Sequence, residues 1–113
     1  MKQVAAIVLA LIVSTNVLAH TSVDSTEPKN GAVLANPPSN IKLNFENKIR
    51  LTRVSQTFQT TEPAQLDIGQ QRSFSTTFSF PFQNRGNGKY VIQWRGLGTD
   101  GHTMQGEFSF MVD

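Results

Sequence analysis

Short runs in which large apolar residues recur at every second position mark much of this 113-residue sequence from residue 41 to its end. The clearest runs are residues 89–95, with Tyr90, Ile92 and Trp94 in one parity, and residues 104–112, with Phe108 and Phe110 in one parity. A spacing of two puts all these apolar side chains on one face of a β-strand. Residues 41–45 and 72–82 have similar spacing, and residues 49–58 are rich in the Thr, Val and Phe typical of strands. No stretch after residue 19 has the apolar spacing of a helix. The pattern therefore predicts an all-β domain.

Turn-forming residues separate these runs. Residues 28–31 read Pro-Lys-Asn-Gly, residues 36–39 read Asn-Pro-Pro-Ser, and residues 84–88 read Asn-Arg-Gly-Asn-Gly. Residues 59–71 are polar, contain Pro63 and Gly69, and are expected to form a loop. Short strands at this spacing predict a single Greek-key β-sandwich of about seven strands, of the immunoglobulin-like or cupredoxin-like type.

Several large apolar residues are expected to pack in the core of this sandwich. Four phenylalanines share one parity in residues 72–82, which predicts a strand with a phenylalanine-rich inner face: Phe74, Phe78, Phe80 and Phe82. Met104 and Met111 lie in the last predicted strand, and core packing is the expected role of both.

Residues 1–19 have the layout of a secretory signal peptide. Lys2 precedes an apolar run over residues 4–13, and the segment ends in Val17-Leu18-Ala19, which suits signal peptidase. The alternative is a membrane anchor, but a spanning helix needs about 20 apolar residues. We therefore expect export and cleavage after Ala19, leaving residues 20–113 as one domain.

Charge and cysteine content exclude several functions. Loss of Lys2 leaves nine lysines and arginines against eight acidic residues, so the mature chain is almost neutral and nucleic-acid binding is not predicted. The sequence contains no cysteine. This excludes thiolate metal sites, thiol redox chemistry and attachment as a lipoprotein.

The two histidines, His20 and His102, are the candidate metal ligands. Cleavage after Ala19 would make His20 the first residue, so that its α-amine and imidazole chelate one ion. Asp100 and His102 are separated by Gly101, and side chains two residues apart in extended backbone point the same way. Two imidazoles, an amine and a carboxylate suit a tetragonal copper(II) ion, with zinc as the competing metal.

Each half of this set is common when taken alone. An Asp-Gly turn with a nearby histidine occurs on many protein surfaces. The prediction of a metal site therefore depends on the position that His20 takes after cleavage.

Longer segments resemble the CopC family of periplasmic copper-binding proteins. The segments that carry the resemblance are Ala-His at 19–20, Pro-Lys-Asn-Gly-Ala at 28–32, Pro-Pro-Ser-Asn-Ile-Lys-Leu-Asn-Phe-Glu at 37–46, Tyr-Val-Ile-Gln-Trp-Arg at 90–95, Asp-Gly-His at 100–102 and Gly-Glu-Phe-Ser-Phe-Met-Val at 106–112. The resemblance implies a Greek-key sandwich with one copper(II) per chain, bound by His20, Asp100 and His102. It also implies that Glu46 lies nearby and bonds the metal-bound amine or water. The implied partner is an inner-membrane copper protein of the CopD type, and the protein itself is expected to be a monomer.

The sequence departs from this family at three places. Thr21 follows His20 where members often have a second histidine. No methionine occurs between Met1 and Met104, so the methionine-rich loop that binds copper(I) in some members is missing. Gly96-Leu97-Gly98 replaces bulkier residues, which predicts a looser approach to Asp100.

The sequence thus predicts a periplasmic protein, not an enzyme, that sequesters or carries copper(II) for homeostasis or resistance. One alternative is a copper enzyme of the kind that cleaves polysaccharides oxidatively and also uses an N-terminal histidine chelate. Such an enzyme needs an open coordination position, which Asp100 would fill. The other alternative is a β-sandwich binding module without metal.

Overall fold

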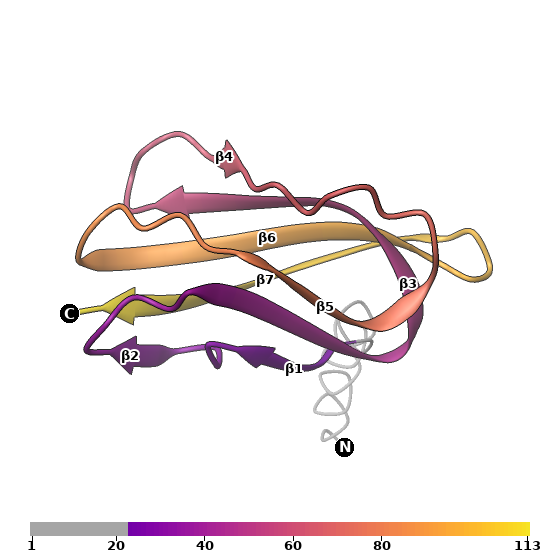
Figure 1. The fold of residues 1–113 in the computed structure, drawn as a ribbon, viewed down its shortest axis with the longest axis horizontal. Helices are drawn as coiled ribbons and strands as arrows, with labels where there is room; N and C mark the ends of the chain where they lie inside the picture. Colours follow the sequence, from indigo (N-terminus) through magenta and orange to yellow (C-terminus); the bar gives the residue numbers. More distant parts are fainter. Residues whose placement is uncertain (1–22) are drawn as a thin grey trace, which may run out of the picture.

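The structure, a computed structural model, describes residues 23–113. Within them the chain forms seven strands and no helix, and thus no helix able to cross a membrane. The strands are β1 (Val23–Glu27), β2 (Ala32–Leu34), β3 (Asn40–Phe58), β4 (Ala64–Gln65), β5 (Ser75–Pro81), β6 (Gly88–Gly98) and β7 (Thr103–Val112). The predicted all-β fold of about seven strands is confirmed (Figure 1).

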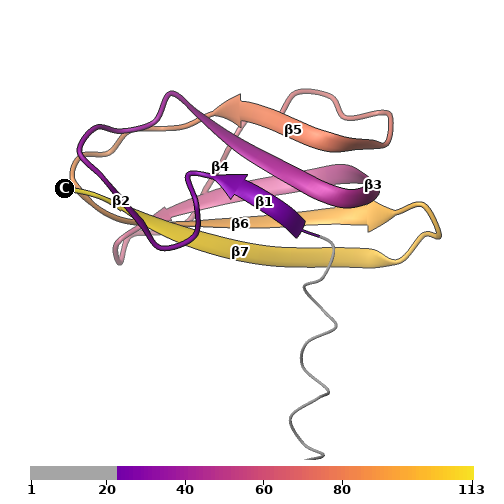
Figure 2. The ribbon, with the colours of Figure 1, turned by 90° about the horizontal axis from the view of Figure 1, so that it is seen from below.

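The long strand β3 belongs to both layers of the sandwich. Its first half pairs with β1 and β5, both antiparallel. Its second half pairs with β4 and β6, and that layer continues through β7 to β2, which runs parallel to β7. Figure 1 shows β3 curving round at one end of the molecule, and Figure 2 shows β5 and β7 in opposite layers. The turn of β3 thus connects the two sheets.

This continuous strand differs from the two separate β segments expected on either side of Glu46. The polar residues Glu46, Asn47 and Lys48 do not end the strand; they lie exposed at its bend. The pairing with β5 is irregular between Asn44 and Ile49, and the pairing with β6 begins at Ile49. The polar run therefore marks a change of partner strand, at a place where side chains point to solvent.

The core has the alternation that the sequence predicts. In β6 the inward residues Tyr90, Ile92 and Trp94 are buried, and in β7 Phe108 and Phe110 are buried. The other buried apolar residues are Ile41, Leu43, Phe45, Ile49, Leu51, Val54, Leu66, Phe78, Phe80 and Val112. The buried hydroxyl of Tyr90 donates to the carbonyl of Gly86 at 2.6 Å, so its polar atom is satisfied.

Three local expectations were wrong. Residues 59–71 contain the short strand β4, which pairs with Ser55 and Gln56 of β3. Phe74 precedes β5 and is 41% exposed, because regular pairing along this side begins only at Ser75. Met111 is 39% exposed, since its parity in β7 is opposite to that of Phe110, whereas Met104 packs against the core as expected.

The hairpin between β6 and β7 lies at the same end of the sandwich as the bend of β3. Its paired strands extend from Gly88 opposite Val112 to Leu97 opposite Thr103. Gly98 is paired with Ile49, directly after the bend. The tip of the hairpin therefore projects beyond the bend of β3, as Figure 1 shows.

Candidate metal centre

The hairpin tip is a tight turn over residues 98–102. The Gly98 N–H donates to the carbonyl of His102 at 2.9 Å, and the Gly101 N–H donates to the carbonyl of Gly98 at 3.0 Å. Gly101 has a φ of 87°, a conformation that a residue with a Cβ adopts only at a cost. Glycine between Asp100 and His102 thus lets the chain turn so that both side chains lie on one side of the tip.

Asp100 and His102 are in direct contact. Oδ1 of Asp100 accepts the backbone N–H of His102 at 3.0 Å, and Oδ2 lies 2.9 Å from Nδ1 of the imidazole. Both side chains are open to solvent, with exposed fractions of 67% for Asp100 and 84% for His102. A carboxylate and an imidazole are therefore held together on an accessible projection.

Each group shifts the pKa of the other. The side-chain hydrogen bond to Asp100 and then the carboxylate charge raise the pKa of His102 above its ordinary 6.5. The same hydrogen bond from His102, followed by the backbone N–H, lowers the pKa of Asp100 below 3.8. In the metal-free protein the pair therefore favours an ionised carboxylate beside a protonated imidazole.

The two glycines before the tip lie where neighbouring groups leave little room for a side chain. Gly96 and Gly98 are both buried in β6. A methyl group on Gly98 would lie 3.0 Å from Oδ1 of Asp100 and 3.4 Å from Sδ of Met104. The Asp100 carboxylate and Met104 thus occupy the space that a side chain at position 98 would need, a long-range contact that local spacing does not predict.

Glu46 is the other predicted site residue within residues 23–113, and no hydrogen bond or ion pair joins it to Asp100 or His102. It is exposed at the bend of β3. No group of three His, Cys, Asp or Glu residues able to hold a metal occurs in this part of the chain. His20 and the predicted signal peptide lie outside the described residues.

The first described residue is nevertheless close to the hairpin strands. Val23 is paired with Phe45, whose ring meets that of Trp94 edge-on with centroids 5.0 Å apart. Val23, Trp94 and Gly106 line one groove of about 570 Å³ between β1 and β7. Because β1 and β7 run in the same direction (Figure 1), the start of β1 points toward the end of the sandwich where the hairpin tip lies.

These features define a β-sandwich protein with a carboxylate–imidazole pair on an exposed hairpin. The sequence pattern of the CopC domain matches residues 23–113, and the chain therefore belongs to the CopC family, as its motifs indicate. A comparison with curated proteins found no match.

Solved structures show the same fold. CopC from Methylosinus trichosporium OB3b superposes with a TM-score of 0.69 at 22% identity, over 83% of this chain and 94% of that one. PcoC from Escherichia coli, a methionine-rich copper resistance protein, gives a TM-score of 0.60 at 23% identity, over 84% of this chain and all (100%) of that one. Identities this low establish the sandwich fold alone.

Proposed function

We propose that this protein is exported to the periplasm, where it binds one copper(II) ion per chain and sequesters or carries it. The proposed ligands are the amine and imidazole of His20, the carboxylate of Asp100 and the imidazole of His102. The observation that carries the proposal is the 2.9 Å separation between Nδ1 of His102 and Oδ2 of Asp100 on the exposed tip. Membership of the CopC family, which includes proteins named for copper resistance, supports the choice of metal.

The spacing of the two donor atoms fits a single ion. Two metal–ligand bonds of about 2.0 Å at a right angle put their donor atoms roughly 2.8 Å apart. The observed 2.9 Å between Nδ1 and Oδ2 is close to this spacing, and a metal that displaces the proton between them would need only a small rotation of the two exposed side chains. Copper(II) prefers such cis positions in a tetragonal plane, and it has the highest affinity among the common divalent metals.

The remaining donors would come from the N-terminus. Val23 begins β1 beside the groove that Gly106 also lines, and Gly106 follows His102 by four residues in β7. Three extended residues span at most about 10 Å, and four residues of a strand span about 13 Å. The three residues thus cover most of this span, and we propose that the reach of the His20, Asp100 and His102 side chains closes the rest. Glu46, at the bend of the same end, is the proposed acceptor for the metal-bound amine or water.

An accessible site suits a carrier better than an enzyme. Asp100 and His102 are mostly exposed, so a partner protein has direct access to the bound ion. With His20, Asp100 and His102 all bound, four donors would fill a tetragonal plane and leave none of its positions for a substrate or oxygen. The partner that we propose is an inner-membrane protein of the CopD type, and we expect the carrier to be a monomer. Polysaccharide oxidation and a metal-free sandwich remain the alternatives. A peroxide-dependent oxidation assay on polysaccharides tests the first, and a copper titration tests the second.

The experiment is a copper(II) titration of the mature protein followed by electron paramagnetic resonance and thermal melts. We expect saturation at one copper per chain and a higher melting temperature, because the ion would bind the folded state selectively. His102→Ala and one alanine added before His20 should each weaken binding at least tenfold. Asp67→Ala is the matched control: Asp67 is exposed and accepts the N–H of Gly69 at 2.9 Å in a similar turn. Wild-type affinity in His102→Ala would show that the hairpin pair is not part of a copper site.

A further inference from the structure

A β-bulge in β3 determines which residues meet on the outer face of the larger sheet. Leu51 is opposite Gly96, but Arg53, not Thr52, is opposite Arg95, so β3 has one extra residue at this point. Thr52 and Arg53 are consequently both exposed, and burial resumes at Val54. The Thr52 hydroxyl donates to the carbonyl of Arg95 at 3.1 Å and holds the bulge against β6. Bulges commonly re-aim a side chain in this way.

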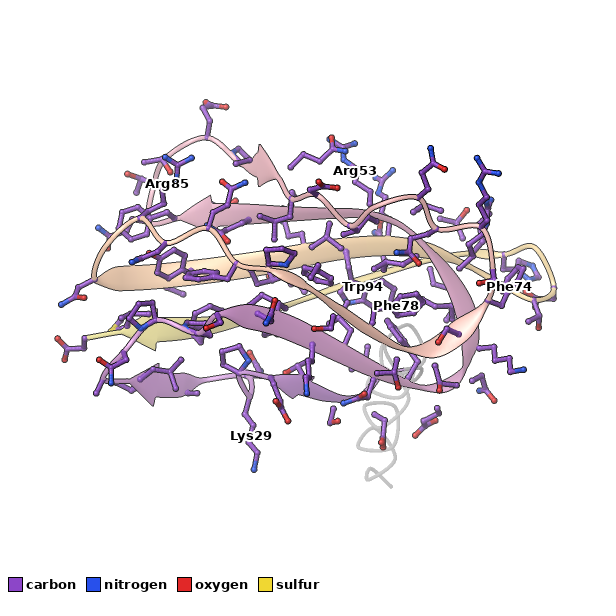
Figure 3. The ribbon with its side chains drawn as sticks, in the orientation of Figure 1. Lys29, Arg53, Phe74, Phe78, Arg85 and Trp94 are labelled. Atoms are coloured by element: carbon purple, nitrogen blue, oxygen red, sulfur yellow. The ribbon has the colours of Figure 1, made fainter. Side chains whose placement is uncertain are left out.

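The bulge puts two positive charges directly opposite each other. Side chains of directly opposed residues in antiparallel strands have Cβ atoms about 4.5–5.5 Å apart, and like charges at this spacing destabilise the sheet. The only ion pair within residues 23–113 is that of Asp100 and His102, so neither arginine is neutralised by a carboxylate of the described chain. Figure 3 shows Arg53 projecting outward from β3, whereas Trp94 lies inside the sandwich.

Both arginines line a hollow of about 600 Å³ on this outer face. Hydrogen-bonding side chains from three strands surround them: Ser55 of β3, Gln93 of β6, and Gln105 and Glu107 of β7. Pro63, in the segment before β4, forms one wall. The one acid, Glu107, accepts a hydrogen bond from Gln93 at 3.4 Å and not from an arginine.

We propose that Arg53 and Arg95 form a binding site for a phosphate-type oxyanion with two or more negative charges. Two guanidinium groups present paired N–H donors, a geometry that matches phosphate oxygens. The neighbouring amides and the Ser55 hydroxyl supply further donors. The anion relieves the repulsion between the arginines, which explains why an unpaired pair of this kind is compatible with a stable sheet. The site is separate from the proposed copper ligands and does not depend on them.

The test uses the metal-free mature protein, melted at low ionic strength with and without inorganic pyrophosphate. Arg53→Gln and Arg95→Gln are the test variants, alone and together. Arg85→Gln is the matched control, because the guanidinium of Arg85 is exposed, donates to the side chain of Gln83 and lies well away from Arg53 in Figure 3. Potassium chloride at equal ionic strength controls for screening.

Without the anion, each test variant should melt about 1–5 °C above wild type, because a repulsion is removed. Pyrophosphate should stabilise wild type and Arg85→Gln, and its affinity should fall about tenfold in Arg53→Gln and Arg95→Gln. Glu107→Gln should bind pyrophosphate more tightly than wild type, since a negative charge leaves the rim. An equal response of all variants, or no response beyond that to potassium chloride, would overturn the proposal.

Vesicles separate the two sources of such an anion. Sedimentation with phosphatidic acid vesicles but not with phosphatidylcholine vesicles, abolished by Arg53→Gln, would assign a lipid headgroup. Binding of pyrophosphate without vesicle binding would assign a soluble phosphate compound. Failure of both probes would refute the site.

Discussion

The carboxylate of Asp100 lies in the space that a side chain on Gly98 would need, because a methyl group at this position would lie 3.0 Å from Oδ1 of Asp100. The φ of Gly98 is not in the left-handed region, so the backbone itself accepts alanine there. The contact atom is the far end of a side chain, which can rotate away. Gly98 therefore controls where the proposed copper ligand lies, without being needed for the strand.

Gly98→Ala should weaken copper(II) binding about tenfold while changing the melting temperature of the metal-free protein little. The added methyl group displaces the Asp100 carboxylate and breaks its 2.9 Å approach to His102. Gly96→Ala is the contrasting variant. Its methyl group would lie 2.9 Å from Cδ1 of Ile49 and 3.0 Å from the backbone oxygen of Arg50, so it should destabilise the fold by about 1–3 kcal/mol. Copper titrations with parallel melts distinguish the two effects.

Asp100→Asn should lower the pKa of His102 toward 6.5, because the asparagine removes the carboxylate that stabilises the imidazolium. In wild type the His102 contribution to stability is complete below pH 6.5 and is lost as the pH rises through the raised pKa. The Asp100 contribution is present above pH 3.8 and is lost as the pH falls through the lowered pKa. Proton NMR of the imidazole in metal-free protein, assigned with His102→Ala, measures the shift. An unchanged pKa in Asp100→Asn would mean that the pair is not formed in solution.

The strands and the pair at positions 100 and 102 were predictable because both depend on local spacing. Alternation identified the buried faces of β6 and β7, and an Asp-Gly-His sequence brings i and i+2 side chains together in a turn. The spacing also predicts that Met104 and Met111 lie on opposite faces of β7, because Met104 has the parity of the buried Phe108 and Met111 does not. Parity thus predicts core packing for Met104 and exposure for Met111.

The long-range features were not predictable from one sequence. The continuity of β3 through Glu46 depends on a bend that transfers the strand from β5 to β6, and polar residues at a bend are not distinguishable from those of a loop. Arg53 and Arg95 are 42 positions apart in the sequence, and they lie opposite each other only because the bulge adds one residue to β3. His20, the third residue of the proposed copper site, lies outside the described residues, and its role stays a prediction.

Reduction should release the metal to a modest copper(I) chelator. Copper(I) prefers sulfur ligands, and the sequence has no cysteine and only three methionines. Met111 is paired with Val33, at the opposite end of β7 from the hairpin tip, which leaves Met104 as the single thioether near Gly98. Titration with ascorbate and a chromophoric copper(I) chelator measures the release. Retention in wild type that is lost in Met104→Leu would instead identify Met104 as a copper(I) ligand.

Gly106→Ala should lower the free energy of unfolding by about 1–3 kcal/mol, because it overpacks the core. Each kcal/mol should lower the melting temperature by roughly 4–8 °C. A methyl group on Gly106 would lie 2.8 Å from Cζ2 of the Trp94 indole. The indole is 3% exposed and packs edge-on against Phe45 with ring centroids 5.0 Å apart, so it must shift against this packing to admit the methyl group. Trp94 is the single tryptophan of the chain, so its fluorescence reports the disturbance directly.

Two further variants separate overpacking from a general effect of substitution in β7. Gln105→Ala, at the exposed neighbouring position, should leave stability and fluorescence almost unchanged. Trp94→Phe removes the atoms that Gly106→Ala would strike, so the double variant should lose less stability than the two single variants added together. Strictly additive losses would show that the close approach between Gly106 and Trp94 does not constrain position 106. In that case another property of the glycine, such as its backbone freedom, would have to explain any loss of stability in Gly106→Ala.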